Sequence, residues 1–311
     1  MIDKLYLCVV QDDKKREEMV DYKLLNALQV VIEQQSFERA ANVLCISQPA
    51  VSQRIKLLEE YVAQPVLIRS QPLIATDIGQ RLLKHYKQVQ HLEAELLPSI
   101  SATSTEKSVV MAIAVNADSL ATWFIPALAP LLKQYPIELN LHIMDEARTL
   151  EKVKAGEAFG ALSLQSKPLP GCEVTLLGEL NYVLVATPEF VLQYLPEGIT
   201  QQALRKAPAV SFDHKDDMHI KFIEQHFNLA GGSYPCHIVR SSEAFVAMAN
   251  AGVAYCLIPK LQIEDELASG KLVKITETQL TIPLYWHRWI LLKGLYKQVS
   301  EQIIAAAKHT M

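Results

Sequence analysis

Hydrophobic positions recur at three- and four-residue spacing in two short stretches between residues 36 and 61, which predicts two helices around a tight turn. The inward stripe of the first stretch consists of Phe37, Ala40, Ala41 and Leu44. The inward stripe of the second consists of Val51, Ile55 and Leu58. Ser36 and Ser47 precede the two stretches as N-caps, and Pro49 falls in the first turn of the second helix, where its missing N–H costs nothing. The pattern therefore predicts a capped helix-turn-helix.

The second helix leaves a polar face outward. Its outward residues are Gln48, Ala50, Ser52, Gln53, Arg54 and Lys56. Gln can pair with adenine and Arg with guanine, Ala or the ring of Pro49 can meet a thymine methyl group, and Ser or Lys can hold phosphates. This face therefore predicts binding in a DNA major groove, with Ser47 and Arg39 as further contacts. An ordinary amphipathic helical hairpin is the alternative interpretation.

The flanking pattern extends the helix-turn-helix into a winged form. A helix is expected at about residues 21–34, and residues 64–76 alternate as a short β-hairpin, the wing. Arg69 lies at the base of this wing, where it could meet a phosphate or instead form a salt bridge with Glu59 or Glu60.

A long helix is expected at about residues 77–97, with Thr76 as its cap. Leu82, Val89 and Leu96 are seven residues apart with Leu92 between them, a coiled-coil-like stripe that predicts dimerisation. A symmetric dimer would match a pseudo-palindromic DNA site. Residues 99–108 are rich in Ser and Thr and are expected to form a hinge.

From Val109 onward strands alternate with helices, which predicts parallel sheets covered on both faces. Two such halves joined by crossing strands would form a clamshell with a ligand site between them. The predicted fold is thus an N-terminal all-α winged helix-turn-helix with a linker helix, followed by a C-terminal α/β, two-lobed domain like the periplasmic binding proteins. The expected boundaries are an N-terminal extension at 1–19, without assigned function, a DNA-binding domain at 20–77, linker helix and hinge at 78–107, and effector domain at 108–311.

Composition changes this picture little. The chain has 311 residues, half of them hydrophobic, and a net charge of −4. Residues 20–100 carry eight basic and eight acidic residues, so DNA affinity must come from local placement of cations rather than a bulk basic field. Five scattered cysteines without CxxC spacing, and no apolar stretch long enough for a signal or membrane segment, favour a reducing cytoplasm and no membrane partner.

The segment FERAANVLCISQPAVSQRIKLLEE (37–60) resembles the N-terminal signature of the LysR-type transcriptional regulators, and the likeness extends from Val20 onward. Segments such as VNADSLATWFIPALAP (115–130), FDHKDDMH (212–219) and LYWHR (284–288) are similar to the subgroup that senses lysine and arginine and regulates arginine export. This resemblance implies a homodimer or homotetramer on double-stranded promoter DNA, a lysine or arginine effector, and RNA polymerase as a candidate partner. One departure is the wing, where residues 71–75 lack the further basic residue usual in the family.

A basic amino acid brings a carboxylate and two cations, and the sequence offers groups for each. The strand-to-helix junction at residues 116–120 could hold the carboxylate through backbone N–H groups and Ser119, next to Leu120. Asp118, Asp145 and Asp213 could bind the cations, with an N-cap role as an equal alternative for Asp118. Ser242 belongs to a predicted helix start, Ser241-Ser242-Glu243, that could offer further N–H donors, but plain capping is favoured for this segment.

Other functions receive less support. The sequence contains no GxSxG, phosphate-binding glycine loop or HExxH, so neither an enzyme nor a cofactor is predicted. His214 and His219 are spaced wrongly for one helical face, which disfavours a metal site, and His287 is interpreted as strand packing. A solute-binding protein would not explain residues 20–100. A LysR-type regulator of another ligand, or an architectural DNA binder at a replication origin, remains as an alternative.

Overall fold

The computed structural model describes residues 20–100, 108–144, 148–213 and 217–311. The chain divides into two compact units, here unit 1 (up to Val89) and unit 2 (from Gln90), and the division falls within a long helix. Each unit is described by itself.

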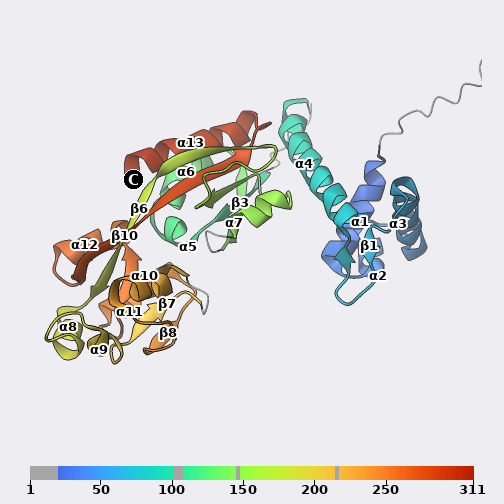
Figure 1. Cartoon of the computed structure of the whole chain (residues 1–311). Coiled ribbons are helices and arrows are strands. Elements are labelled where there is room, and N and C mark those ends of the chain that lie inside the picture. Colours follow the sequence, from blue (N-terminus) through green and yellow to red (C-terminus); the bar gives the residue numbers. More distant parts are fainter. Residues whose placement is uncertain (1–19, 101–107, 145–147, 214–216) are drawn as a thin grey trace, which may run out of the picture. The chain divides into compact units, whose positions relative to one another are not determined.

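Unit 1 is a three-helix head with a short wing (Figure 1). Its elements are α1 (Tyr22–Gln34), α2 (Phe37–Val43), α3 (Gln48–Val62), β1 (Leu67–Ile68), β2 (Ile74–Ala75) and the first part of α4 (Asp77–Ile100). Strands β1 and β2 pair antiparallel, as expected for the wing. The Thr76 hydroxyl accepts the backbone N–H of Gly79 at 3.2 Å, so the predicted cap of the long helix is confirmed.

The core of unit 1 comes from the predicted stripes. Ala40, Val51, Ile55 and Leu58 are fully buried, together with Leu25, Leu28 and Val31 of α1. Burial of one face of each helix leaves the opposite face of α3 outward.

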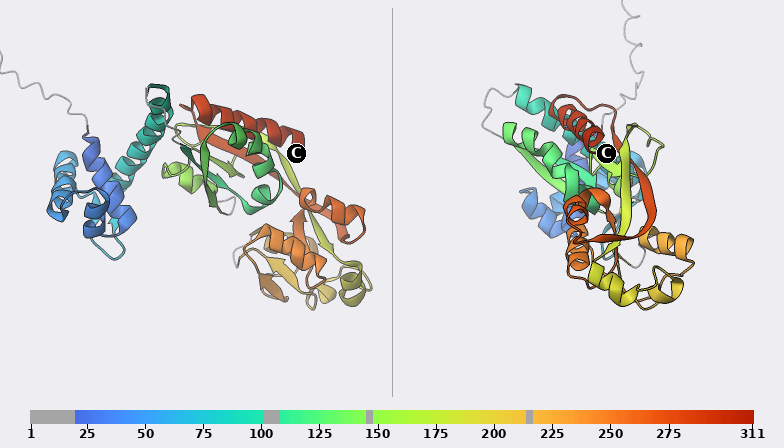
Figure 2. Two further views of the ribbon diagram at one scale, coloured as in Figure 1. Left: turned by 180° about the vertical axis from the view of Figure 1, so that it is seen from behind. Right: turned by 90° about the vertical axis from the view of Figure 1, so that its left-hand side faces the viewer.

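Unit 2 consists of two lobes connected by two long strands, β6 (Cys172–Ala186) and β10 (Val273–Trp289), which pair antiparallel (Figures 1 and 2). Lobe 1 contains β3 (Val109–Val115), α5 (Ala117–Ser119), the π-helix η1 (Leu120–Phe124), α6 (Ile125–Gln134), β4 (Ile137–Ile143), α7 (Thr149–Lys154), β5 (Gly160–Ser163) and α13 (Gly294–Thr310). Lobe 2 contains α8 (Pro188–Tyr194), α9 (Gln201–Leu204), β7 (Ala209–Ser211), α10 (Asp217–Phe227), β8 (Cys236–Ile238), α11 (Ser242–Asn250), β9 (Cys256–Pro259), η2 (Lys260–Gln262) and α12 (Glu264–Ala268).

The prediction of parallel sheets is only partly right. Strands β3, β4 and β5 are parallel neighbours, and so are β7 and β8. The largest sheet, however, has the order β4-β3-β5-β10-β6-β9, and β10 runs antiparallel to both β5 and β6. The sheet is mixed because the chain crosses to lobe 2 on β6 and returns on β10, in opposite directions.

Candidate DNA interface and ligand site

The turn before α3 sets the direction of its polar face. The Ser47 hydroxyl accepts the backbone N–H of Ala50 at 3.4 Å, and the Ser36 hydroxyl does the same for Arg39 at 3.3 Å. Both serines are N-caps in extended conformation, as predicted. Two capped helix starts within twelve residues therefore define the geometry of the head locally.

None of the predicted reading residues is buried. Gln48, Pro49, Gln53 and Lys56 are exposed, and Ala50, Ser52 and Arg54 are partly exposed. The Gln48 amide donates to the Ser52 hydroxyl at 3.1 Å, one turn along the same face. Lys56 lies 3.6 Å from Glu60, an exposed pair that costs little to separate. Within unit 1, the polar face of α3 is therefore accessible to a binding partner.

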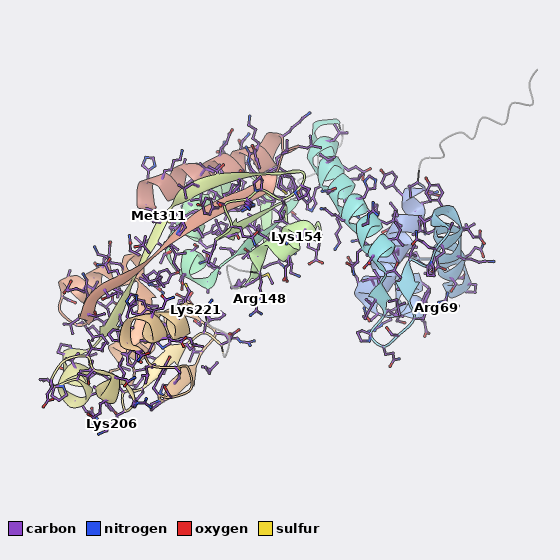
Figure 3. All side chains as sticks on the ribbon, in the orientation of Figure 1. Arg69, Arg148, Lys154, Lys206, Lys221 and Met311 are labelled. Atoms are coloured by element: carbon purple, nitrogen blue, oxygen red, sulfur yellow. The ribbon has the colours of Figure 1, made fainter. Side chains whose placement is uncertain are left out.

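The two remaining cations of the predicted interface lie outside α3. Arg39 is exposed on α2. The Arg69 guanidinium lies 5.5 Å from the ring centroid of Phe37 (Figure 3), a cation–π contact. The suggested salt bridge to Glu59 or Glu60 is not what the structure shows, because Glu59 accepts the Val66 N–H and Glu60 faces Lys56. Besides the exposed Arg69, the wing exposes the paired residues Ile68 and Ile74.

In unit 2 a carboxylate of lobe 1 accepts one hydroxyl from the crossing strand β6 and one from lobe 2. The Tyr182 hydroxyl and the Ser242 hydroxyl each donate to Asp118, at 2.6 Å. Ser242 also lies 2.9 Å from the Gln262 amide oxygen. Tyr182 and Ser242 are almost fully buried, and bonds this short are typical of charge-assisted hydrogen bonds. The capping alternative for Asp118 is wrong, because Asn116 is the N-cap and the carboxylate points across to lobe 2.

The capping role predicted for residues 241–243 is confirmed, and it falls to Ser241. The cap of α11 is Ser241, whose hydroxyl accepts the Ala244 N–H at 3.2 Å. Ser242 is thereby placed in the first turn with its hydroxyl directed to Asp118.

Next to Asp118 lies a buried hydroxyl without a partner. Ser119 is fully buried, and its Oγ has no hydrogen-bond partner among the described residues. A buried polar group in this state costs free energy unless a ligand or water satisfies it. The helix continues from α5 into η1, whose first residue, Leu120, is half-buried. Such π-helical turns are frequent at functional sites.

Asp213 has a partner from the other lobe. Its carboxylate lies 3.7 Å from the Arg148 guanidinium, which precedes α7 in lobe 1. Asp145, the third predicted cation ligand, lies outside the described residues. The structure therefore brings Asp118 and Ser242 together and adds a cross-lobe ion pair at Asp213.

Two of the three histidines considered in the sequence analysis, His219 and His287, are buried in the structure. His287 is fully buried, and its Nε2 donates to the Gln165 carbonyl at 2.6 Å. Burial lowers the pKa of His287 below its ordinary value, while the hydrogen bond to Gln165 acts in the opposite direction. His219 stacks with Tyr234 and Tyr255, and His214 lies outside the described residues. No group of three metal-ligating side chains occurs within the described ranges.

Sequence reasoning missed Tyr182, Gln262 and Arg148. Tyr182 lies within an apolar strand and had the signature of a core residue. Arg148 carried one usable signal, because it lies two residues after the acidic pair at residues 145 and 146, which follows a strand. Among the described residues, no helix has the length and apolar character needed to cross a bilayer.

Comparison with known proteins agrees with this geometry. Residues 22–80 match the family model for the bacterial regulatory helix-turn-helix protein, lysR family, and residues 106–289 match the LysR substrate binding domain. The HTH-type transcriptional regulator ArgP of Aeromonas salmonicida is 57% identical over 293 residues, covering 94% of this chain and 98% of the relative.

Two solved structures are similar over the whole chain. ArgP from Mycobacterium tuberculosis is 35% identical with a TM-score of 0.82, covering 93% of this chain and 98% of its own. Full-length LysG from Corynebacterium glutamicum, solved with the bound effector Arg, is 31% identical with a TM-score of 0.77, covering 93% and 99%. The matches thus span both units.

Proposed function

This chain belongs to the LysR family of bacterial helix-turn-helix regulators, and we propose that lysine or arginine, bound between the lobes of unit 2, modulates its binding to promoter DNA. The observation that carries the proposal is the pairing of similarity to ArgP along both units with a lobe 1 carboxylate, Asp118, that accepts one donor from β6 and one from lobe 2. The arginine bound to the LysG relative supports the class of ligand.

On the DNA side, α3 supplies the readers. In the proposal Gln48 and Arg54 contact base edges, Gln53 lies beside them, and Pro49 and Ala50 meet thymine methyl groups. Phosphate contacts are assigned to Arg39, Ser47, Ser52, Lys56 and Arg69. The exposed Leu92 and Leu96 of α4 support dimerisation through this helix, and a homotetramer and RNA polymerase are further proposed partners.

On the effector side, each ligand group has a matching protein group. The unpartnered hydroxyl of Ser119, at the start of a continuous helix, is suited to a carboxylate. The Asp118 carboxylate, which accepts hydroxyls from Tyr182 and Ser242, is assigned to an ammonium group of the effector because the two charges are opposite. Asp213 and Asp145 are assigned to the cations, and Leu120 is assigned to the apolar part of the ligand.

Calorimetric titration of the full-length protein with lysine and arginine, and with leucine as a control, tests the effector assignment. Both basic amino acids should bind, leucine should not, and Asp118→Ala and Asp213→Ala should weaken binding. Unchanged affinity in the Asp145→Ala and Asp213→Ala proteins would remove these residues from the site.

Footprinting on duplexes selected from a random library tests the regulatory assignment. We expect the footprint length to change when lysine or arginine is added. A sequence-loose footprint that ignores both amino acids would indicate an architectural role instead.

Substitutions on α3 separate base reading from phosphate binding. Arg54→Ala should lower affinity for the selected duplex by about 1–3 kcal/mol and relax base preference. Lys56→Ala should weaken binding to every sequence similarly and reduce the salt dependence by about one unit of slope. Equal losses on selected and random DNA for Arg54→Ala would reverse the two roles.

A further inference from the structure

Arg148 has no role in the proposed function, yet the fold holds it at one of the assigned cation ligands. Its backbone is fixed by the residue that follows, because the buried Thr149 hydroxyl donates to the Leu162 carbonyl of β5. The guanidinium therefore extends from an anchored position at the side of lobe 1 that is turned toward lobe 2 (Figure 3).

Asp213 is anchored in the same way on lobe 2. The buried Ser211 hydroxyl, at the end of β7, donates to the Asp213 carbonyl at 3.0 Å. The Asp213 side chain is only 15% exposed, whereas that of Arg148 is 46% exposed. Asp213 is therefore the more buried partner of this ion pair, and Arg148 is the more exposed one.

The cationic member of this ion pair, a guanidinium, is the same chemical group as the distal cation of arginine. A guanidinium 3.7 Å from Asp213 occupies the place that the distal cation of arginine or lysine would take. Two cations on one carboxylate repel each other at short range, so the first weakens the binding of the second. A protein cation at this position therefore competes with the effector cation for Asp213.

On the basis of the proposed function, we infer that the Arg148 side chain competes with the distal cation of the effector for Asp213. The Arg148–Asp213 ion pair sets the effector affinity below the value that the cleft would otherwise reach. The Arg148–Asp213 ion pair also connects the two lobes. Effector binding would therefore replace a contact between the lobes with a contact between the effector and Asp213.

The test is calorimetric titration of the full-length protein with lysine and with arginine. Arg148→Gln should bind both amino acids about two- to five-fold more tightly than wild type, the range that a partly exposed ion pair supports. Arg148→Lys keeps a cation and should stay close to wild type. Lys154→Gln removes the same charge from the exposed far end of α7 and should also leave the affinity unchanged. In an Asp213→Asn background, Arg148→Gln should have no effect.

The outcomes separate the two proposals. Wild-type protein that binds neither lysine nor arginine would overturn the proposed function together with this inference. Wild-type protein that binds them, with Arg148→Gln equal or weaker, would overturn the inference alone, because Arg148 would then preorganise the cleft or bind the ligand carboxylate. An equal gain in Lys154→Gln would also overturn it, by showing a general effect of charge.

Discussion

The two candidate sites of this molecule are built in opposite ways. The DNA interface is concentrated on α3, between Ser47 and Lys56, and a cap and a buried stripe on the same helix orient it. The candidate effector site joins Asp118 to Ser242, which are 124 residues apart. One site is local in sequence, and the other depends on the crossing of β6 and β10.

This difference has a physical consequence. A local site changes when its own helix is perturbed, and the cost stays within unit 1. A distributed site changes whenever the crossing strands or their packing shift, because each lobe supplies only part of the hydrogen-bonding groups. Perturbations of the two cores should therefore have separable effects on DNA and effector binding.

The largest expected effect is in the core of unit 1. Ile55 is fully buried, and Ile55→Ala should destabilise this unit by about 2–5 kcal/mol through lost burial and a residual cavity. Calorimetric unfolding should show one transition lowered while lysine still raises the other. Leu57→Ala, on the exposed side of the same helix, should change stability by less than about 0.5 kcal/mol. Equal shifts in both transitions would contradict the separation of the units.

A smaller effect is expected at the close approach between β5 and β10. A Cβ on Gly160 would lie 2.4 Å from ring atoms of Trp286, which is itself fixed by a 2.8 Å hydrogen bond to Ser300. Gly160→Ala should cost about 1–3 kcal/mol and weaken effector binding without changing DNA binding by the head. Urea denaturation followed by circular dichroism measures the cost. Adding Trp286→Phe should recover part of the loss, and strictly additive losses would argue against this contact.

The decrease in protein stability at acidic pH should depend on the protonation of His287. Its pKa is lowered in the folded state by burial, so the unfolded state binds more protons between the folded pKa and the ordinary value near 6.5. The contribution of His287 to the free energy of unfolding should therefore be fully present above pH 6.5. It should decrease as the pH falls through this window, by no more than about 1.4 kcal/mol per pH unit. His287→Gln should flatten this decline in urea titrations at several pH values. His309→Gln, at an exposed position of α13, should leave it unchanged.

The smallest expected effect is at the cap of the reading helix. Ser47→Ala should destabilise unit 1 by about 1 kcal/mol, because the Ala50 N–H loses its acceptor. Ser47→Asn keeps an acceptor and should restore stability in thermal unfolding. A loss of effector affinity in Ser47→Ala protein without DNA would show that the effect of this cap is not confined to unit 1.

The sequence predicted the elements that depend on neighbouring residues. The two caps, the wing and the Thr76 cap are confirmed, since each follows from spacing within one or two turns. The α3 stripe is buried as predicted, whereas in α2 Ala40 and Ala41 are buried and Phe37 and Leu44 are partly buried. The parallel arrangement of the whole large sheet was wrong, because strand direction depends on where the chain crosses between lobes and not on strand composition.

The sequence by itself thus determined the winged head, the outward face of α3 and the presence of acidic groups at strand ends. Only the tertiary structure decided that Asp118 meets Tyr182 and Ser242 and that Arg148 meets Asp213. The reason is the range of the forces involved. Helix periodicity and capping act over a few residues, whereas a cross-lobe hydrogen bond or ion pair forms only after the crossing strands have brought distant segments within a few ångströms.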